Sequence, residues 1–167
     1  MRPLAWAPFV IVLVACSGAP ATHAPDVTTV LTPNATLDRV VDGDTIDVIV
    51  DGVEERVRLI GIDTPETKKP NSPVECFGPE ASAYTESLLP EGTPLYLERD
   101  VEPRDPYDRL LAYVYLADGT FVNLQIVRQG YAQVLTIPPN VAHAEQFVQA
   151  AREAEAADAG LWSGCSG

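Results

Sequence analysis

The chain has 167 residues, of which 46% are hydrophobic and 21% charged, which is enough for one globular domain of ordinary core size and a terminal tail. Eleven Lys and Arg residues stand against 24 Asp and Glu residues, a net charge of -13. This balance excludes a protein whose whole surface attracts nucleic acid or anionic lipid, so any phosphate-binding surface must be local.

The N-terminus is typical of a targeting segment. Arg2 precedes an apolar run, residues 4–15, that is shorter than the roughly 20 residues needed to span a bilayer. The run ends in LVAC, which resembles the lipobox of bacterial lipoproteins, so we expect residues 1–15 to be removed and Cys16 to be acylated. The alternative is a secretory signal cut after Ala24. In the first case the exported protein is anchored to a membrane, at the cell surface or in the periplasm, and in the second it is secreted.

Three cysteines in an exported protein leave one without a partner. Acylation of Cys16 would remove the odd one and leave Cys76 and Cys165 as a pair. An oxidising compartment favours a disulfide between them, and two free thiols are the alternative. The bridge would tie the end of the chain to the loop that follows residues 59–69.

Residues 17–35 are rich in Pro, Ala and Thr, without periodicity, and predict a flexible tether before a single domain at residues 36–167. The domain opens with three segments of alternating apolar residues, TLDRVV, TIDVIV and EERVRLIGI. The last two are separated by a DG pair, residues 51–52, so the sequence predicts a three-stranded meander.

The rest of the domain mixes helices and strands. GPEASAYTESLL at 78–89 has helical spacing of its apolar residues and ends before a proline. PLYLERD and RLLAYVYLA predict strands, the latter ending at a second DG hairpin signal. Asn123 is expected to cap a short helix, LQIVRQ, followed by a short strand, YAQVL. A last helix is predicted at about 141–157, with Trp162 folding back as an apolar plug. Five strands and three helices indicate an α+β fold, most economically a small closed barrel.

The two histidines, one in the tether and one near a helix start, argue against a Ser-His-Asp triad, and the absence of a CxxC or HxxxH pattern argues against a zinc site. Carboxylates carry more information. Asp44 follows a DG pair at the start of a strand, and Asp63 ends the apolar strand of LIGIDTPETKK. If these strands are neighbours, the two carboxylates converge, and with the Thr64 carbonyl they offer the hard oxygen ligands that suit Ca²⁺. Taken alone, Asp44 is better explained by a turn cap, and the joint pattern is what favours a metal.

Two arginines add a second kind of site. Arg58 shares a strand face with apolar residues, and Arg109 opens a strand after YD. A guanidinium can grip a phosphate with two hydrogen bonds and stabilise the charge that develops on it during displacement. Each arginine alone would be explained by a structural ion pair. Together with a metal and the spare carboxylate of Glu66, they predict a phosphodiesterase.

Five blocks in order and at matching spacing resemble the staphylococcal nuclease family: DGDT (42–45), RLIGIDTPET (58–67), FGPEASAYT (77–85), YDRLLAYVY (107–115) and VNLQIVRQGYA (122–132). The resemblance covers about residues 36–163 and implies a five-stranded OB-fold-type β-barrel with three α-helices.

The resemblance also implies the activity, a Ca²⁺-dependent cleavage of DNA and RNA that prefers single strands and leaves 3′-phosphate ends. It assigns Ca²⁺ to Asp44, Asp63 and the Thr64 carbonyl, water activation to Glu66 and the scissile phosphate to Arg58 and Arg109. Tyr107 would contact the nucleotide. Lys68 and Lys69 would steer the nucleic acid backbone, or form a solvated surface pair. The chain has no heptad pattern or broad apolar edge, so we expect a monomer.

Four residues depart from the family pattern. Pro106 replaces a lysine, and Thr136 and Pro138 replace two tyrosines at the edge of the nucleotide pocket. Asp108 replaces a glycine beside Arg109, where it is expected to neutralise part of the charge of the arginine clamp, which is formed by Arg58 and Arg109. The alternatives are a nucleic-acid- or protein-binding module of the same fold with little catalysis, and a surface lipoprotein with a structural Ca²⁺ site.

Overall fold

The computed structural model describes residues 31–67 and 73–165. The predicted signal segment, Cys16, most of the tether, Lys68 and Lys69 lie outside these ranges. No helix within the two ranges is both long and apolar enough to cross a membrane.

Five strands close into a barrel in the order β1-β2-β3-β6-β5. They are β1 (Ala35–Asp42), β2 (Thr45–Val50), β3 (Val53–Leu59), β5 (Pro94–Glu98) and β6 (Leu110–Leu116). All neighbours are antiparallel except β3 and β6, which run parallel. Alternating apolar residues such as Ile46, Val48, Val57 and Leu59 are fully buried inside the barrel. The predicted α+β barrel is confirmed.

The third predicted strand is split in two. β3 ends at Leu59, and the chain turns through Gly61, whose φ of +84° is a conformation that glycine adopts without strain. A Cβ atom there would lie 2.3 Å from the ring of Phe147, so only glycine allows this approach. The short β4 (Gly61–Asp63) then leaves the barrel and pairs with β7 (Gln133–Leu135). This turn places Asp63 and the residues after it at one end of the barrel.

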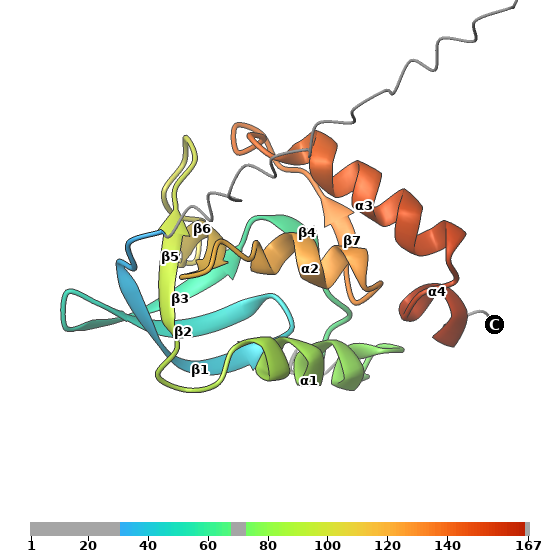
Figure 1. Cartoon of the computed structure of the whole chain (residues 1–167), viewed down its shortest axis with the longest axis horizontal. Helices are drawn as coiled ribbons and strands as arrows, with labels where there is room; N and C mark the ends of the chain where they lie inside the picture. The colour runs from blue at the N-terminus through green and yellow to red at the C-terminus, as the bar shows by residue number, and fades with distance from the viewer. Residues whose placement is uncertain (1–30, 68–72, 166–167) are drawn as a thin grey trace, which may run out of the picture.

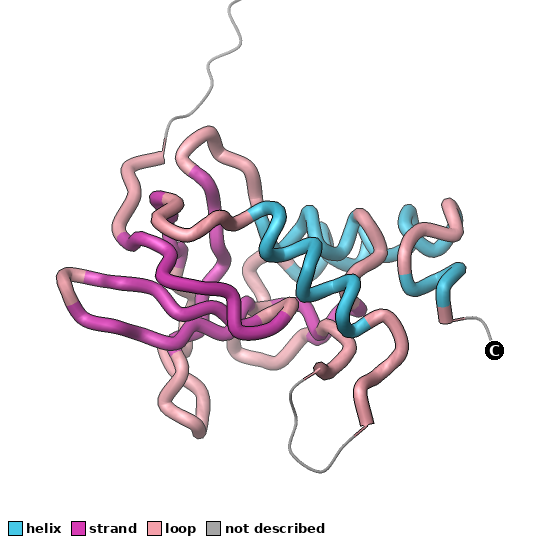
Figure 2. The backbone as a smooth tube through the Cα atoms, turned by 90° about the horizontal axis from the view of Figure 1, so that it is seen from below, coloured by secondary structure: helices cyan, strands magenta, loops and turns pink. Residues whose placement is uncertain are grey.

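The helices gather at one side of the barrel (Figure 1), and the same separation of strands from helices is visible in Figure 2. They are α1 (Gly78–Leu88), α2 (Val122–Arg128), α3 (Ala144–Ala156) and the four-residue α4 (Leu161–Gly164). α1 contacts β1, whereas α2 lies between β6 and α3. The core is continuous from the barrel to Phe147 and Ala150 of α3.

Asn123 was expected to cap α2, and this prediction was wrong. The residue before the helix is Phe121, and Asn123 lies inside the helix, fully buried. Its side-chain amide donates to the Ile60 carbonyl at 2.9 Å and accepts from the Val114 N–H at 2.9 Å. Asn123 therefore joins α2 to β6 and to Ile60, which follows β3. A buried amide with backbone partners stabilises a fold more than a helix cap that is exposed to water.

The C-terminal elements differ from prediction in three details. The DG pair at 118–119 forms a turn that leads into α2, with only an isolated bridge from Tyr115 to Phe121 in place of a second strand. α3 begins at Ala144, three residues later than expected. Trp162 falls in α4, where the neighbouring Leu161 is the buried residue. The predicted disulfide is present between Cys76 and Cys165, across 89 residues of sequence.

Candidate active site

The tight turn between β1 and β2 meets the end of β4. Asp44, in this turn, accepts a hydrogen bond from the Thr64 N–H at 2.9 Å and another from the Thr45 hydroxyl at 3.0 Å. Asp44 and Thr64 are both buried. Asp44 therefore does more than cap a turn, because it holds the strand end that carries Asp63.

Arg58 lies between the two carboxylates. Its Nη2 is 3.1 Å from Asp44 and 2.8 Å from Asp63, while Nη1 donates to the carbonyls of Leu59 and Ile62 at 2.8 Å each. The side chain is only 14% exposed. A buried guanidinium needs hydrogen-bond acceptors for its N–H groups, and two carbonyls and two carboxylates supply them here. The two carbonyls hold the guanidinium at the wall of a polar cavity.

A polar cavity of about 310 Å³ collects the predicted catalytic residues. Its walls come from the end of β1, the start of β2 and the turn between them, from β3, from the end of β4 and the segment after it, and from the residue before β6. The lining residues are Asp42, Asp44, Thr45, Arg58, Asp63, Thr64, Glu66, Glu75 and Arg109. Arg58, Glu66 and Arg109 thus face one space together with Asp44 and Asp63.

The carboxylates crowd this cavity with negative charge. Burial raises the pKa of Asp63, and the neighbouring Asp44, Glu75 and Glu66 raise it further against the opposing charge of Arg58. Burial likewise raises the pKa of Asp42, with a hydrogen bond to Glu66 acting in the same direction. A site with more carboxylates than arginines is stabilised by an added cation.

The predicted donor set fits a hard divalent cation. No three His, Cys, Asp or Glu side chains within residues 31–67 and 73–165 form a ready cluster, but the predicted set needs two carboxylates and one backbone carbonyl. The positive Arg58 nitrogen already lies between the two carboxylates, at hydrogen-bonding distance from both. All the donors are oxygens, which Ca²⁺ prefers, whereas protein sites for Zn²⁺ are built mainly from His nitrogen and Cys sulfur.

Asp105 is a site residue that the sequence analysis missed. It accepts from the Arg109 Nε at 2.6 Å and from the backbone N–H groups of Tyr107 and Arg109. Burial acts to raise the pKa of Asp105, but these hydrogen bonds outweigh it and hold the pKa below its usual range. The segment PRDPYDR offers two aspartates near the arginine, and spacing alone does not tell which one pairs with it.

Asp108 was expected to neutralise the clamp, and the structure gives it another partner. Its carboxylate lies 3.6 Å from the Nε of Arg104 and is 89% exposed. Its φ of 66° explains why a glycine suits this position elsewhere. Tyr107, also exposed, has its ring 5.6 Å from the Arg109 guanidinium, so it stands at the rim of the phosphate site.

A second, largely apolar cavity of about 210 Å³ adjoins the two arginines. It is lined by Arg58, Leu59, Ile60, Glu102, Asp105, Pro106, Arg109, Leu111, Leu135, Ile137 and Asn140. Thr136 and Pro138 were expected at this edge, but Leu135 and Ile137 face it instead. Pairing of β7 with β4 and the bridge from Ile137 to Asn140 set this alternation. The cavity has aliphatic walls and no aromatic side chain.

The chain is similar to known nucleases. Residues 56–164 match the family model described as staphylococcal nuclease homologue. The chain is 46% identical to the thermonuclease of Staphylococcus intermedius over 124 residues, 74% of this chain and 73% of the relative. It is 45% identical to the endonuclease YncB of Bacillus subtilis over 132 residues, 78% of this chain and 62% of the relative. The match to the thermonuclease of Staphylococcus hyicus is 42% over 125 residues, 75% and 73% of the two chains.

The family-model match runs from β3 to α4 and includes Arg58, Asp63, Glu66 and Arg109 of the polar cavity, and it agrees with the chemistry that these residues allow. The chain therefore belongs to the staphylococcal nuclease family, and it is a hydrolase of the nuclease class.

Proposed function

We propose that this protein is a Ca²⁺-dependent nuclease that cleaves single strands of DNA and RNA and leaves 3′-phosphate ends. The observation that carries the proposal is the meeting of two arginines, a spare carboxylate and two cation-binding carboxylates around one cavity. These groups together suit phosphodiester hydrolysis, because a negatively charged phosphate diester must be held, and the charge that develops on it stabilised, while water attacks.

The arginines would hold the scissile phosphate. Arg58 is fixed through its Nη1 by two carbonyls, and its Nη2, paired with Asp44 and Asp63 in this structure, would turn to the phosphate when Ca²⁺ takes these carboxylates. Arg109 is fixed through its Nε by Asp105. Held in this way, both guanidinium groups lose little conformational entropy when the phosphate binds. Their charges stabilise the additional negative charge that builds up on the phosphate oxygens during attack.

Glu66 would accept a proton from the attacking water. As the water oxygen bonds to phosphorus, the bond from phosphorus to the 5′ oxygen breaks, so the phosphate stays on the 3′ side and the 5′ oxygen leaves with a proton from solvent. Ca²⁺, held by Asp44, Asp63 and the Thr64 carbonyl, would supply charge stabilisation to the phosphate. Glu66 is a separate carboxylate in the cavity wall, consistent with a role apart from the metal.

The apolar cavity would receive the nucleoside next to the scissile phosphate. Leu111, Leu135 and Ile137 offer apolar contact to a base or sugar, without the stacking that aromatic rings provide. A base enters a cavity of this kind only after it has left its stack, which favours single-stranded or frayed substrates. The exposed Tyr107 would contact the nucleotide from the rim.

The protein would act outside the cytoplasm as a monomer. The sequence of residues 1–16 supports export with a lipid anchor on Cys16, and residues 17–35 would separate the enzyme from the membrane. The disulfide supports an oxidising location. The net charge of -13 would limit the attraction of nucleic acid to the immediate surroundings of the arginines.

Hydrolysis of denatured DNA by the purified protein tests the proposal. We expect cleavage with Ca²⁺, loss of cleavage with a chelator, and recovery when Ca²⁺ is restored. Product ends are identified by labelling with polynucleotide kinase before and after phosphatase treatment. A folded protein without cleavage at any salt concentration, or cleavage that survives chelation, would contradict it.

A further inference from the structure

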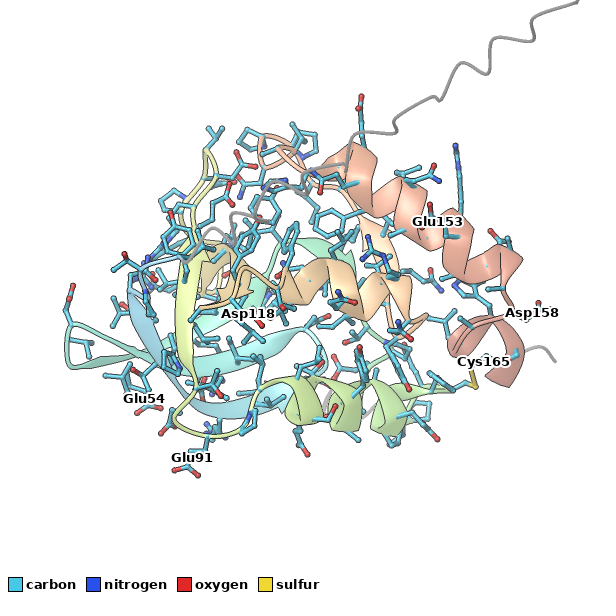
Figure 3. The ribbon with its side chains drawn as sticks, viewed as in Figure 1. Glu54, Glu91, Asp118, Glu153, Asp158 and Cys165 are labelled. Atoms are coloured by element: carbon cyan, nitrogen blue, oxygen red, sulfur yellow. A yellow bond between two sulfur atoms is a disulfide. The ribbon has the colours of Figure 1, made fainter. Side chains whose placement is uncertain are left out.

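The disulfide lies next to the catalytic segment. Cys76 follows Glu75 directly and is bonded to Cys165 at the end of α4. Glu75 lines the same polar cavity as Glu66. Figure 3 shows Cys165 beside the segment that leads into α1, so a covalent bond from the end of the chain reaches a position one residue from the cavity wall.

Glu75 holds the main chain of Glu66 from two sides. The Glu75 N–H donates to the Glu66 carbonyl at 2.9 Å, and the Glu66 N–H donates to the Glu75 carboxylate at 3.1 Å. The backbone position of Glu66 therefore depends on where Glu75 lies. A carboxylate acceptor makes the second hydrogen bond stronger than one between neutral groups.

The start of α1 presses on the same segment. A Cβ atom at Gly78 would lie 3.1 Å from the carbonyl oxygens of both Pro65 and Glu66 and 2.8 Å from the Thr67 methyl group. Residues 75–78 and 65–67 are thus in direct backbone contact. A displacement of the first segment must shift the second, because close-packed atoms leave no space to absorb it.

The other end of the disulfide is attached to the body of the protein. The Leu161 N–H of α4 donates to the Gly130 carbonyl at 2.8 Å, and Leu161 itself is buried. Phe77, next to Cys76, stacks on Tyr131 with ring centroids 5.4 Å apart. The bond therefore joins the catalytic segment to α4, which is fixed on the turn that follows α2.

We propose that the Cys76–Cys165 disulfide acts through Glu75 as a latch that positions Glu66, so that the reduced protein stays folded but cleaves slowly. Glu75 is a positioning residue in this scheme. The inference rests on the proposed function, because it takes Glu66 as the group that activates water. It adds that the activity depends on the redox state of two cysteines outside the cavity.

The switch needs a thiol reductant and no other reagent. Two reductant thiols become one disulfide, and the two electrons and two protons convert the Cys76–Cys165 bond into two thiols. A nuclease that is exported as proposed would remain in its slow form in a reducing cytoplasm and gain full activity after oxidation. Nucleic acid inside the producing cell would then be spared.

Steady-state cleavage of a short single-stranded oligonucleotide tests the latch. At a temperature well below melting, we expect dithiothreitol to lower kcat of the wild-type protein by about 10- to 100-fold, with KM changed far less. The Cys76→Ser/Cys165→Ser double variant should have the low kcat from the start and show no response to dithiothreitol. An unchanged kcat after complete reduction overturns the proposal.

Variants at Glu75 separate positioning from stability. Glu75→Ala keeps the disulfide but should lower kcat, and Glu75→Gln, which keeps an oxygen acceptor for the Glu66 N–H, should restore most of it. Leu95→Ala, in the barrel core, provides a matched loss of melting temperature. It should retain kcat, and a fall in its kcat equal to that of the double variant would reduce the disulfide to a stabilising role.

Hydrogen exchange gives a readout that does not depend on cleavage. Reduction should speed the exchange of the Glu66 and Glu75 amides by at least about tenfold and leave barrel amides such as those of Val48 and Val57 unchanged. Equal protection before and after reduction overturns the latch. Absence of cleavage by the oxidised wild type would contradict the proposed function instead, and exchange would still decide the latch.

Discussion

Asp105 accepts a hydrogen bond from the Nε of Arg109, four residues later, over 2.6 Å, and its other oxygen accepts the backbone N–H groups of Tyr107 and Arg109. One carboxylate thus fixes both the loop before β6 and the guanidinium at its end. The remaining nitrogens of Arg109 are directed by this contact, and Arg109 lines both cavities.

Asp105→Ala should therefore weaken cleavage without touching the substrate. Hydrogen bonds to charged groups contribute about 1.5 to 3 kcal/mol, which corresponds to a fall in kcat/KM of about ten- to a hundredfold. Asp108→Asn is the control, because Asp108 pairs with Arg104 and is exposed. Steady-state kinetics on a defined oligonucleotide measure both, and equal loss in the two variants would show that general charge near the clamp matters more than the Asp105 contact.

Glu66→Gln and Asp44→Asn should separate catalysis from metal binding. A general base typically contributes about 10²- to 10⁴-fold, so Glu66→Gln should lower kcat by this factor while Ca²⁺ binding measured by calorimetry is retained. Asp44→Asn should raise the Ca²⁺ concentration needed for binding and for activity, because a neutral ligand replaces a carboxylate.

Glu80→Gln, at an exposed position of α1, is the control for both variants. If Glu66→Gln cleaves at the wild-type rate, Glu66 does not activate the water. If Asp44→Asn binds Ca²⁺ as tightly as the wild type, the ion is held elsewhere.

Asp47 should make stability depend on pH. Its side chain is only 2% exposed, and it pairs with Arg56 through two hydrogen bonds of 2.8 and 3.1 Å and with Arg39. The hydrogen bond from Arg56, against the opposing effect of burial, holds the pKa of Asp47 below its usual range. The folded state therefore gains stability above the unfolded pKa of Asp47 and loses it as the pH falls through the lower, folded pKa.

Asp47→Asn should thus be less stable than the wild type at neutral pH, and the difference should shrink at about pH 3. Urea unfolding at both pH values measures the free energy of unfolding. Asp51→Asn, in the exposed turn between β2 and β3, should behave like the wild type at both. A difference that stays constant with pH would assign the loss to packing and not to charge.

Much of this molecule is predictable from local pattern. Alternating apolar residues in β1 to β3, the proline after α1 and the DG turn at 51–52 act over a few residues, and the structure confirms each. The resemblance to the family predicted that Arg58, Glu66 and Arg109 share one site, and in the structure all three line one cavity.

The contacts that the sequence did not indicate are those made at a distance. The break after Leu59 depends on the Phe147 ring, more than 80 residues away in the chain. Leu135 and Ile137 line the apolar cavity because β7 pairs with β4, and this pairing sets which side chains face the cavity. Arg109 pairs with Asp105 and not with Asp108 because the backbone of this loop turns Asp105 inward, and only the folded backbone determines this.

Asn123 is the clearest case, because its residue type suggested a cap while its burial gives it a different role. Its amide donates to the carbonyls of Ile60 and Ala112 and accepts from the N–H of Val114, at distances of 2.9 to 3.4 Å. Asn123→Ala would leave these backbone groups buried without a side-chain partner, at a cost of about 1 to 3 kcal/mol for each unsatisfied group. The free energy of unfolding should fall by at least about 2 kcal/mol.

Urea unfolding followed by circular dichroism measures this loss. Arg128→Ala, at the exposed end of the same helix, controls for a change of helix propensity and should cost less than about 0.5 kcal/mol. Because Ile60 precedes the turn that delivers β4, the same variant should also lower kcat by letting Asp63 and Glu66 shift. Equal stability of the two variants would mean that α2 is held by its apolar contacts alone, and that the buried amide does not place the site.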